Sequence, residues 1–146
     1  MMNSRILLRC GVFFLMFMSS LSQGAEINLY RHISTSRELY DGMKLVAGRI
    51  ICREAHTGFS IWMNVRQEED RPGHYILPNS SDNRHELRVR LGGEGWSQRV
   101  GEETPGVIRF GQKEQAIFDV LSDGNQRATP GEYIFSVSGK CLISED

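Results

Sequence analysis

One segment of this sequence has residue types and spacing that could hold a metal ion. His85-Glu86-Leu87-Arg88-Val89 begins like the zinc-binding helix of metalloproteases, in which a second histidine stands four residues after the first. Val89 stands there instead, and apolar residues alternate with polar ones through the segment, as is typical of a strand. The segment therefore predicts no zinc site.

The remaining candidate catalytic groups have no useful spacing. His32, His56 and His74 stand alone, no Gly-x-Ser-x-Gly elbow is present, and Gly93-Glu94-Gly95 is too short for a phosphate-binding loop. Several carboxylates lie in the C-terminal third, but their positions along the chain do not pair them. We predict no catalytic residue, no metal ligand and no cofactor, and a hydrolase is the weakest of the function classes considered.

The N-terminal residues have the form of an export signal. Two arginines precede the apolar run Val12–Met18, and small residues follow just before Ala25. The run is shorter than the ~20 apolar residues that a membrane-spanning helix needs. We expect residues 1–24 to be a cleaved signal peptide and residues 25–146 to be one exported domain.

Removal of that leader would take Cys10 away and leave Cys52 and Cys141. An even pair of cysteines in an exported chain predicts a disulfide, because export leads to an oxidising compartment. The loop between the two is long, so the chain-entropy model gives a stabilisation of about 4–5 kcal/mol. A metal-binding thiol pair is the weaker alternative, since no neighbouring ligand has a suitable spacing.

The charge balance excludes one large class of partners. The chain has 17 Lys and Arg residues against 18 Asp and Glu residues, and loss of the leader would remove two of the arginines. A slightly acidic domain without a basic run is not expected to bind nucleic acid.

Short alternating segments separated by turn residues predict an all-β domain. Residues 114–122 fit either a strand or one face of a helix, and the surrounding strands favour the strand. Residues 26–33 are either a first strand or an extension. The other expected strands are Val46–Arg53, Phe59–Val65, Tyr75–Leu77, His85–Leu91 and Val107–Phe110. This many short strands in one domain indicates a β-sandwich.

The last expected strand, Gly131–Ser138, predicts an open edge. Its start, Pro130-Gly131-Glu132-Tyr133, is like the sixth strand of immunoglobulin-like folds, where a tyrosine corner fixes the turn. Cys141 follows that tyrosine by eight residues rather than two, so the antibody-type disulfide is not reproduced. With no further strand expected, another chain would have to cover the edge formed by Tyr133, Phe135 and Val137.

Two surface features could bind a partner. Arg84, Arg88 and Arg90 should project from one face of a strand, with Glu86 between them, as a cationic stripe for acidic or sulfated partners. The alternative is an ordinary solvated sheet face. Trp96, in a glycine-rich loop, could anchor an interface or fold back over the core.

Several long motifs carry a family resemblance that covers nearly all of residues 25–146. The chain resembles the AfaD/DraD invasins of pathogenic enterobacteria and the minor pilins of aggregative adherence fimbriae, of the AggB and AafB kind. The motifs are Gly48–Phe59, Trp62-Met63-Asn64, His85–Arg90, Gly95-Trp96-Ser97, Ser122–Gln126 and Pro130–Tyr133.

The resemblance implies an incomplete immunoglobulin-like (pilin) β-sandwich that lacks its seventh strand and is completed by donor-strand complementation. A periplasmic chaperone and an outer-membrane usher would assemble it, and the major fimbrial subunit would donate the strand. The expected function is that of a minor subunit at the fimbrial tip, exported through the periplasm to the cell surface for adhesion to host cells and their invasion.

The family is associated with integrins as host receptors. The sequence has no Arg-Gly-Asp, so an integrin contact would need another surface. The rival reading is a self-contained secreted or periplasmic β-sandwich that binds a ligand without any donor.

Overall fold

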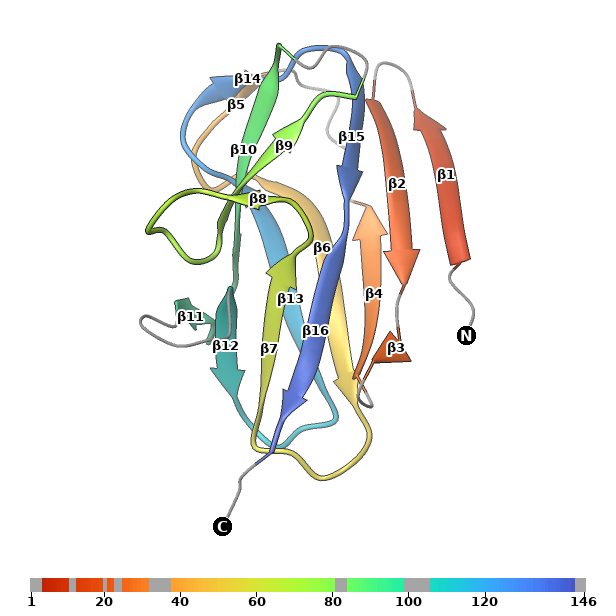
Figure 1. Cartoon of the computed structure of the whole chain (residues 1–146), viewed down its shortest axis with the longest axis vertical. Helices are drawn as coiled ribbons and strands as arrows, with labels where there is room; N and C mark the ends of the chain where they lie inside the picture. Colours follow the sequence, from red (N-terminus) through yellow and green to blue (C-terminus); the bar gives the residue numbers. More distant parts are fainter. Residues whose placement is uncertain are drawn as a thin grey trace.

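The computed structural model of the chain describes residues 4–10, 13–19, 21–22, 25–31, 38–80, 84–98 and 106–143. For residues 4–10, 13–19, 21–22, 31 and 132 only the backbone is described. Every regular element in these ranges is a β-strand (Figure 1). No helix in the described part of the chain is long and apolar enough to cross a membrane.

The strands are named in chain order. They are β1 (Ser4–Cys10), β2 (Phe13–Ser19), β3 (Leu21–Ser22), β4 (Ala25–Arg31), β5 (Glu38–Leu39), β6 (Lys44–Cys52), β7 (Gly58–Met63), β8 (Arg66–Gln67), β9 (His74–Pro78), β10 (Glu86–Gly92), β11 (Ser97–Gln98), β12 (Val107–Phe110), β13 (Gln115–Ser122), β14 (Gln126–Arg127), β15 (Gly131–Phe135) and β16 (Val137–Leu142).

The larger sheet has seven strands in the order β3-β4-β6-β13-β10-β9-β8, and each pairs antiparallel with its neighbours. β13 settles the ambiguous segment as a strand, because buried and more exposed residues alternate along it. β10 has the same alternation, with Leu87, Val89 and Leu91 buried. One face of this sheet therefore forms half of the core.

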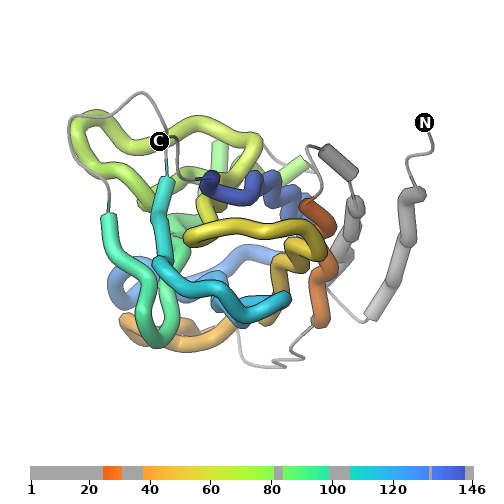
Figure 2. The backbone as a smooth tube through the Cα atoms, turned by 90° about the horizontal axis from the view of Figure 1, so that it is seen from below, coloured from red at the N-terminus to blue at the C-terminus, as the bar shows by residue number. Residues whose placement is uncertain are grey.

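The smaller sheet has the order β11-β12-β7-β16. On β7, Phe59, Ile61 and Met63 are buried in the core, while Trp62, which alternates with them, is only partly buried and packs against the core cluster. The two sheets form a sandwich, and in Figure 2, which looks along the length of the molecule, the strands surround a common interior.

Close packing between strands depends on one glycine in particular. A Cβ on Gly48 of β6 would lie 2.5 Å from the Cζ atom of Phe118 on β13. The missing side chain therefore makes room for the Phe118 ring, which is fully buried. Interiors as dense as this leave no space for an added methyl group.

The predicted disulfide is present between Cys52 and Cys141, with the two Cα atoms 5.9 Å apart. Cys52 ends β6 in the larger sheet, and Cys141 lies near the end of β16 in the smaller one. The bond therefore ties the two layers together at the pole of the sandwich where the last described strand ends (Figure 1).

Candidate functional site

The last two strands, β15 and β16, form the edge on which the sequence analysis placed a donor groove. Tyr133, Phe135 and Val137 alternate along them and are all buried, with 1–3% of their surface exposed. β16 pairs with β7 on one side. β15 does not pair with any strand of the two main sheets; its pairing partner lies outside them.

That partner is β2, which lies parallel to β15. The register runs from Gly131 opposite Phe13 to Phe135 opposite Phe17, so the whole of β15 is paired. β2 also contacts β4, and Figure 1 shows it beside β15, between that strand and β1. The position beside the last strand is thus filled by residues that the sequence analysis assigns to a leader.

A tyrosine corner fixes the start of this edge, as the motif predicts. The Tyr133 hydroxyl donates to the carbonyl oxygen of Thr129 at 2.9 Å. Asn79, which is fully buried, donates from Nδ2 to the Pro130 carbonyl oxygen at 3.2 Å and to the Tyr133 hydroxyl at 3.3 Å. Gly131 has φ +154°, and a Cβ there would clash with the Asn79 amide.

Asn79 holds the tyrosine corner in place, and the sequence did not predict this role. It follows β9 in the chain, 51 positions before the Pro130 carbonyl to which it donates. No local pattern signals such a contact, although a buried amide must find partners somewhere. The corner therefore joins β15 to the turn after β9.

The cationic stripe is only partly available for binding. Arg90 is held by two carboxylates, with Nη1 at 2.6 Å from Asp41 Oδ1 and at 3.2 Å from Asp123 Oδ1. Arg88 is exposed, and Arg84 is exposed just before β10 begins. The three arginines thus differ in role, because the Arg90 charge is already neutralised within the fold.

The Asp123 carboxylate contacts the basic side chains of His74, Arg71 and Arg90. His74 Nδ1 lies 2.8 Å from its Oδ2, and Arg71 Nη1 lies 3.6 Å from the same oxygen. Desolvation raises the pKa of Asp123, but the hydrogen bonds and charges of His74, Arg90 and Arg71 outweigh it and leave the pKa lowered. This network ties the turn after β13 to β9 and β10.

Asp41 completes the network from the loop before β6. The hydrogen bond from Arg90 is the main cause that lowers the pKa of the Asp41 carboxyl, and the backbone N–H of Gly124 adds to it. Both carboxylates are therefore stabilised in their charged form by partners far away in the sequence.

Trp96 folds back onto the sandwich, one of the two alternatives left open for it. Its Nε1 donates to the carbonyl oxygen of Ile117 at 2.7 Å, and its ring meets the edge of Phe118 with centroids 6.3 Å apart. The pairing of β13 with β10 begins at Asp119, so β10 does not pair with Ile117. The Trp96 indole therefore supplies the hydrogen bond to the Ile117 carbonyl oxygen. Trp96 remains partly exposed.

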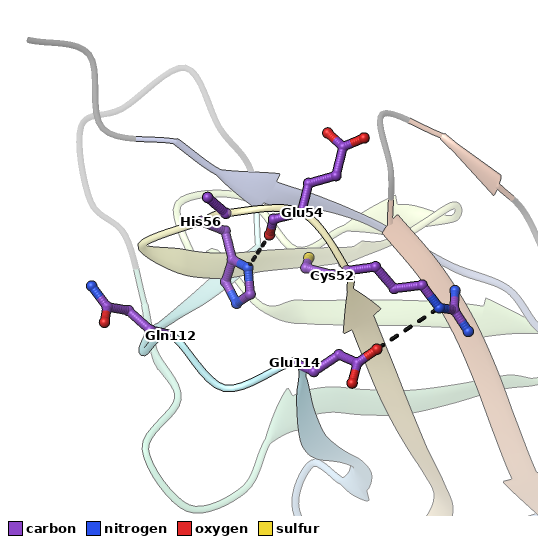
Figure 3. Close-up of a pocket in the computed structure, with 7 residues that line it drawn as sticks. Cys52, Glu54, His56, Gln112 and Glu114 are labelled. Carbon is purple, nitrogen blue, oxygen red and sulfur yellow. Dashed lines mark hydrogen bonds and ion pairs between the residues drawn. The ribbon is translucent and has the colours of Figure 1, made fainter.

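A pocket of about 510 Å³ lies beside the disulfide (Figure 3). His56 lines it, but its Nδ1 lies 2.7 Å from the carbonyl oxygen of Glu54 and its Nε2 lies 2.7 Å from that of Lys113. Arg53 forms an ion pair with Glu114 at 3.8 Å across the same pocket. Both ring nitrogens of His56 thus contact backbone carbonyls, and the ring links the loop of Glu54 to the loop of Lys113.

In the described ranges, no three His, Cys, Asp or Glu side chains gather around a common point. The main structural features of this region are the pairing of β15 with β2, the tyrosine corner at Tyr133 and the Cys52–Cys141 disulfide.

Comparison with known proteins assigns this chain to a family. The family model described as the Enterobacteria AfaD invasin protein matches residues 35–139. The chain belongs to the AfaD invasin family. The protein AggB of Escherichia coli is 55% identical over 92% of the chain and 92% of its own length.

Two solved structures extend the comparison for this AfaD-family chain. One, on fibronectin binding and biofilm formation by AAF fimbriae of enteroaggregative E. coli, is 56% identical with a TM-score of 0.75, over 84% of this chain and 88% of that one. The other, HdaB, the minor tip subunit of the E. coli Hda pilus, is 44% identical with a TM-score of 0.78, over 82% and 84%.

These relatives decide the class of the protein. The fold is an immunoglobulin-like pilin sandwich, and the chain is a subunit of surface fimbriae in the adhesin and invasin class, not an enzyme.

Proposed function

We propose that this AfaD-family chain is a minor subunit at the tip of an adhesive fimbria. Residues 1–24 are a signal peptide, a periplasmic chaperone and an outer-membrane usher assemble the exported domain, and the major subunit donates the strand that completes it. The observation that carries the proposal is the pairing of β2 with β15. Cleavage before Ala25 would remove β1 to β3 and leave the β15 edge without a partner.

An unpaired β15 would be unstable for two reasons. Its backbone N–H and C=O groups on that side would lose their partners, and the buried side chains of Tyr133 and Phe135 would lie beside an open edge. A donor strand would remove both causes of instability, because its backbone would pair with β15 and its apolar side chains would fill the core beside it. Each fully buried apolar side chain contributes about 1.5–3 kcal/mol.

The arrangement of β4 supports a position at the tip. β4 pairs with β6 along its whole length, from Ala25 opposite Cys52 to Arg31 opposite Val46. The segment directly after the proposed cleavage site is therefore already a strand of its own sheet. A subunit built this way needs a donor but offers none, and HdaB, a relative in the same fold, is a minor tip subunit.

The test compares residues 25–146 alone with the same domain carrying a donor strand of the major subunit, fused through a flexible linker to the C-terminus. We expect the fused form to be a monomer with a single cooperative unfolding transition, and the unfused form to aggregate or exchange strands. A matched control carries the same donor with its inward-facing apolar residues changed to Ser. Equal stability of all three forms would support the self-contained β-sandwich instead.

We further propose that the tip position presents the chain to a host-cell receptor, such as an integrin. One related fimbrial structure concerns fibronectin binding, which supports a host-surface target of some kind. Purified complemented domain should bind host cells in a saturable manner. Binding that is no stronger than that of the major subunit alone would contradict a role in adhesion.

A further inference from the structure

The outer face of the seven-stranded sheet carries a patch on three adjacent strands that the groove does not use. Arg49 on β6 lies opposite Ile117 on β13 and opposite Asn28 on β4, two residues before Tyr30. Tyr30 is 46% exposed and Ile117 is 53% exposed. Trp96 borders them through its hydrogen bond to Ile117. We name Tyr30, Arg49, Ile117 and Trp96 the Arg49 patch.

Arg49 sits in this patch without a carboxylate partner in the described ranges. Its Cζ atom lies 5.6 Å from the centre of the Tyr30 ring, a cation–π distance. Nη1 makes one long hydrogen bond, 3.4 Å, to Gln115 Oε1. Nε is buried and makes no hydrogen bond with any described residue. Within the described part of the chain, the guanidinium thus contacts Tyr30 and Gln115 while most of its donors make no hydrogen bond.

The nearby acidic groups are already matched to other cations. Arg53 forms ion pairs with both Glu26 and Glu114, and Lys44 lies 3.8 Å from Asp119. Of the three cations Arg49, Arg53 and Lys44, Arg49 is the one without a carboxylate partner in the described ranges. A half-buried charge without a partner is unfavourable, and an incoming carboxylate would relieve that.

The shape of the patch favours a protein partner over a small ligand. The side chains project from a sheet face, whereas small-molecule sites are concave and bury most of the ligand. Tyr, Trp and Arg are the residue types that contribute most at protein interfaces. Here Arg49 lies opposite the exposed Ile117, and Trp96 donates a hydrogen bond to the backbone carbonyl of Ile117. The matching surface would present a carboxylate flanked by apolar side chains.

We propose that the Arg49 patch is a docking surface for an acidic, partly apolar segment of a partner protein. The carboxylate binds the guanidinium of Arg49, and apolar side chains beside it pack on Tyr30 and Ile117. This surface lies on a different sheet from β16 and does not depend on the proposed role of the β15 edge.

The test titrates the full chain with a capped five-residue peptide in which Asp alternates with Phe and Leu, and follows the Arg49 Nε–H and Ile117 methyl signals by NMR. We expect saturable shifts of both signals. The same peptide with Asn in place of Asp should bind at least about tenfold more weakly, because hydrogen bonds between charged groups are the stronger kind. No saturable shift, or shifts centred on Arg84 and Arg88, would overturn the proposal.

Two variants distinguish specific binding at Arg49 from general electrostatic attraction to the surface. Arg49→Gln and Arg53→Gln remove the same charge from neighbouring positions, but Arg53 is already paired. Arg49→Gln should weaken binding at least about tenfold, and Arg53→Gln less than about twofold. Equal losses would overturn the proposal. If Arg49→Gln does not fold, the exposed substitution Ile117→Asp takes its place, and unchanged affinity in that variant would equally contradict a docking role.

Discussion

Removing the Cys52–Cys141 disulfide should lower the free energy of unfolding by about 4–5 kcal/mol. The two cysteines lie 89 positions apart, and for a loop of this length the chain-entropy model gives about 4.6 kcal/mol at 25 °C. A domain of this kind has about 5–15 kcal/mol in total. The disulfide therefore accounts for a large share of the stability, and it does so by restricting the unfolded chain.

The assay is guanidinium unfolding of the donor-complemented domain, followed by tryptophan fluorescence, for the wild type and for the double variant Cys52→Ser, Cys141→Ser. Reduced wild type is the matched control and should lose the same amount. A loss below about 1 kcal/mol would refute the reasoning.

Three further predictions concern packing, the corner and acid stability. Gly48→Ala places a methyl group 2.5 Å from the Phe118 ring and should cost about 1–3 kcal/mol in thermal unfolding; an unchanged Tm would contradict the tight fit. Tyr133→Phe removes the hydrogen bond to Thr129 and should cost about 1–3 kcal/mol in urea unfolding, whereas a loss under about 0.5 kcal/mol would mean that the corner is unimportant. The lowered pKa of Asp123 means that its contribution is complete above the usual carboxyl value of 3.8 and is lost as pH falls below it. Asp123→Asn should therefore flatten the acid limb of the stability curve, and superimposable acid-unfolding curves would exclude this.

The parts of the fold that could be predicted from the sequence are those with a local signal. Residues 114–122 fit a strand or a helix face, and the short strands around them favour the strand; the turn before Tyr133 indicates the tyrosine corner. The disulfide followed from counting cysteines after a leader. In each case the physical cause lies within a few residues, in the neighbouring segments or in a small number of possible partners, so the sequence pattern and its context were sufficient.

Contacts between distant segments could not be predicted in the same way. Arg90 was expected to project as part of a cationic stripe, but Asp41 and Asp123, which neutralise it, lie 49 and 33 positions away. The Arg49 patch was missed because Tyr30 and Ile117 become its neighbours only through the register of three strands. Register is a property of the whole sheet, and it decides which side chains meet across it.

The central claim is that the β15 edge is a vacant strand position in the processed domain. Hydrogen exchange at the backbone amides of residues 131–135 tests it most directly, in residues 25–146 with and without a donor peptide from the major subunit. We expect rapid exchange without the donor and strong protection with it, while amides of β7 and β13 change far less. Amides of β15 that are equally protected in both samples would contradict the claim.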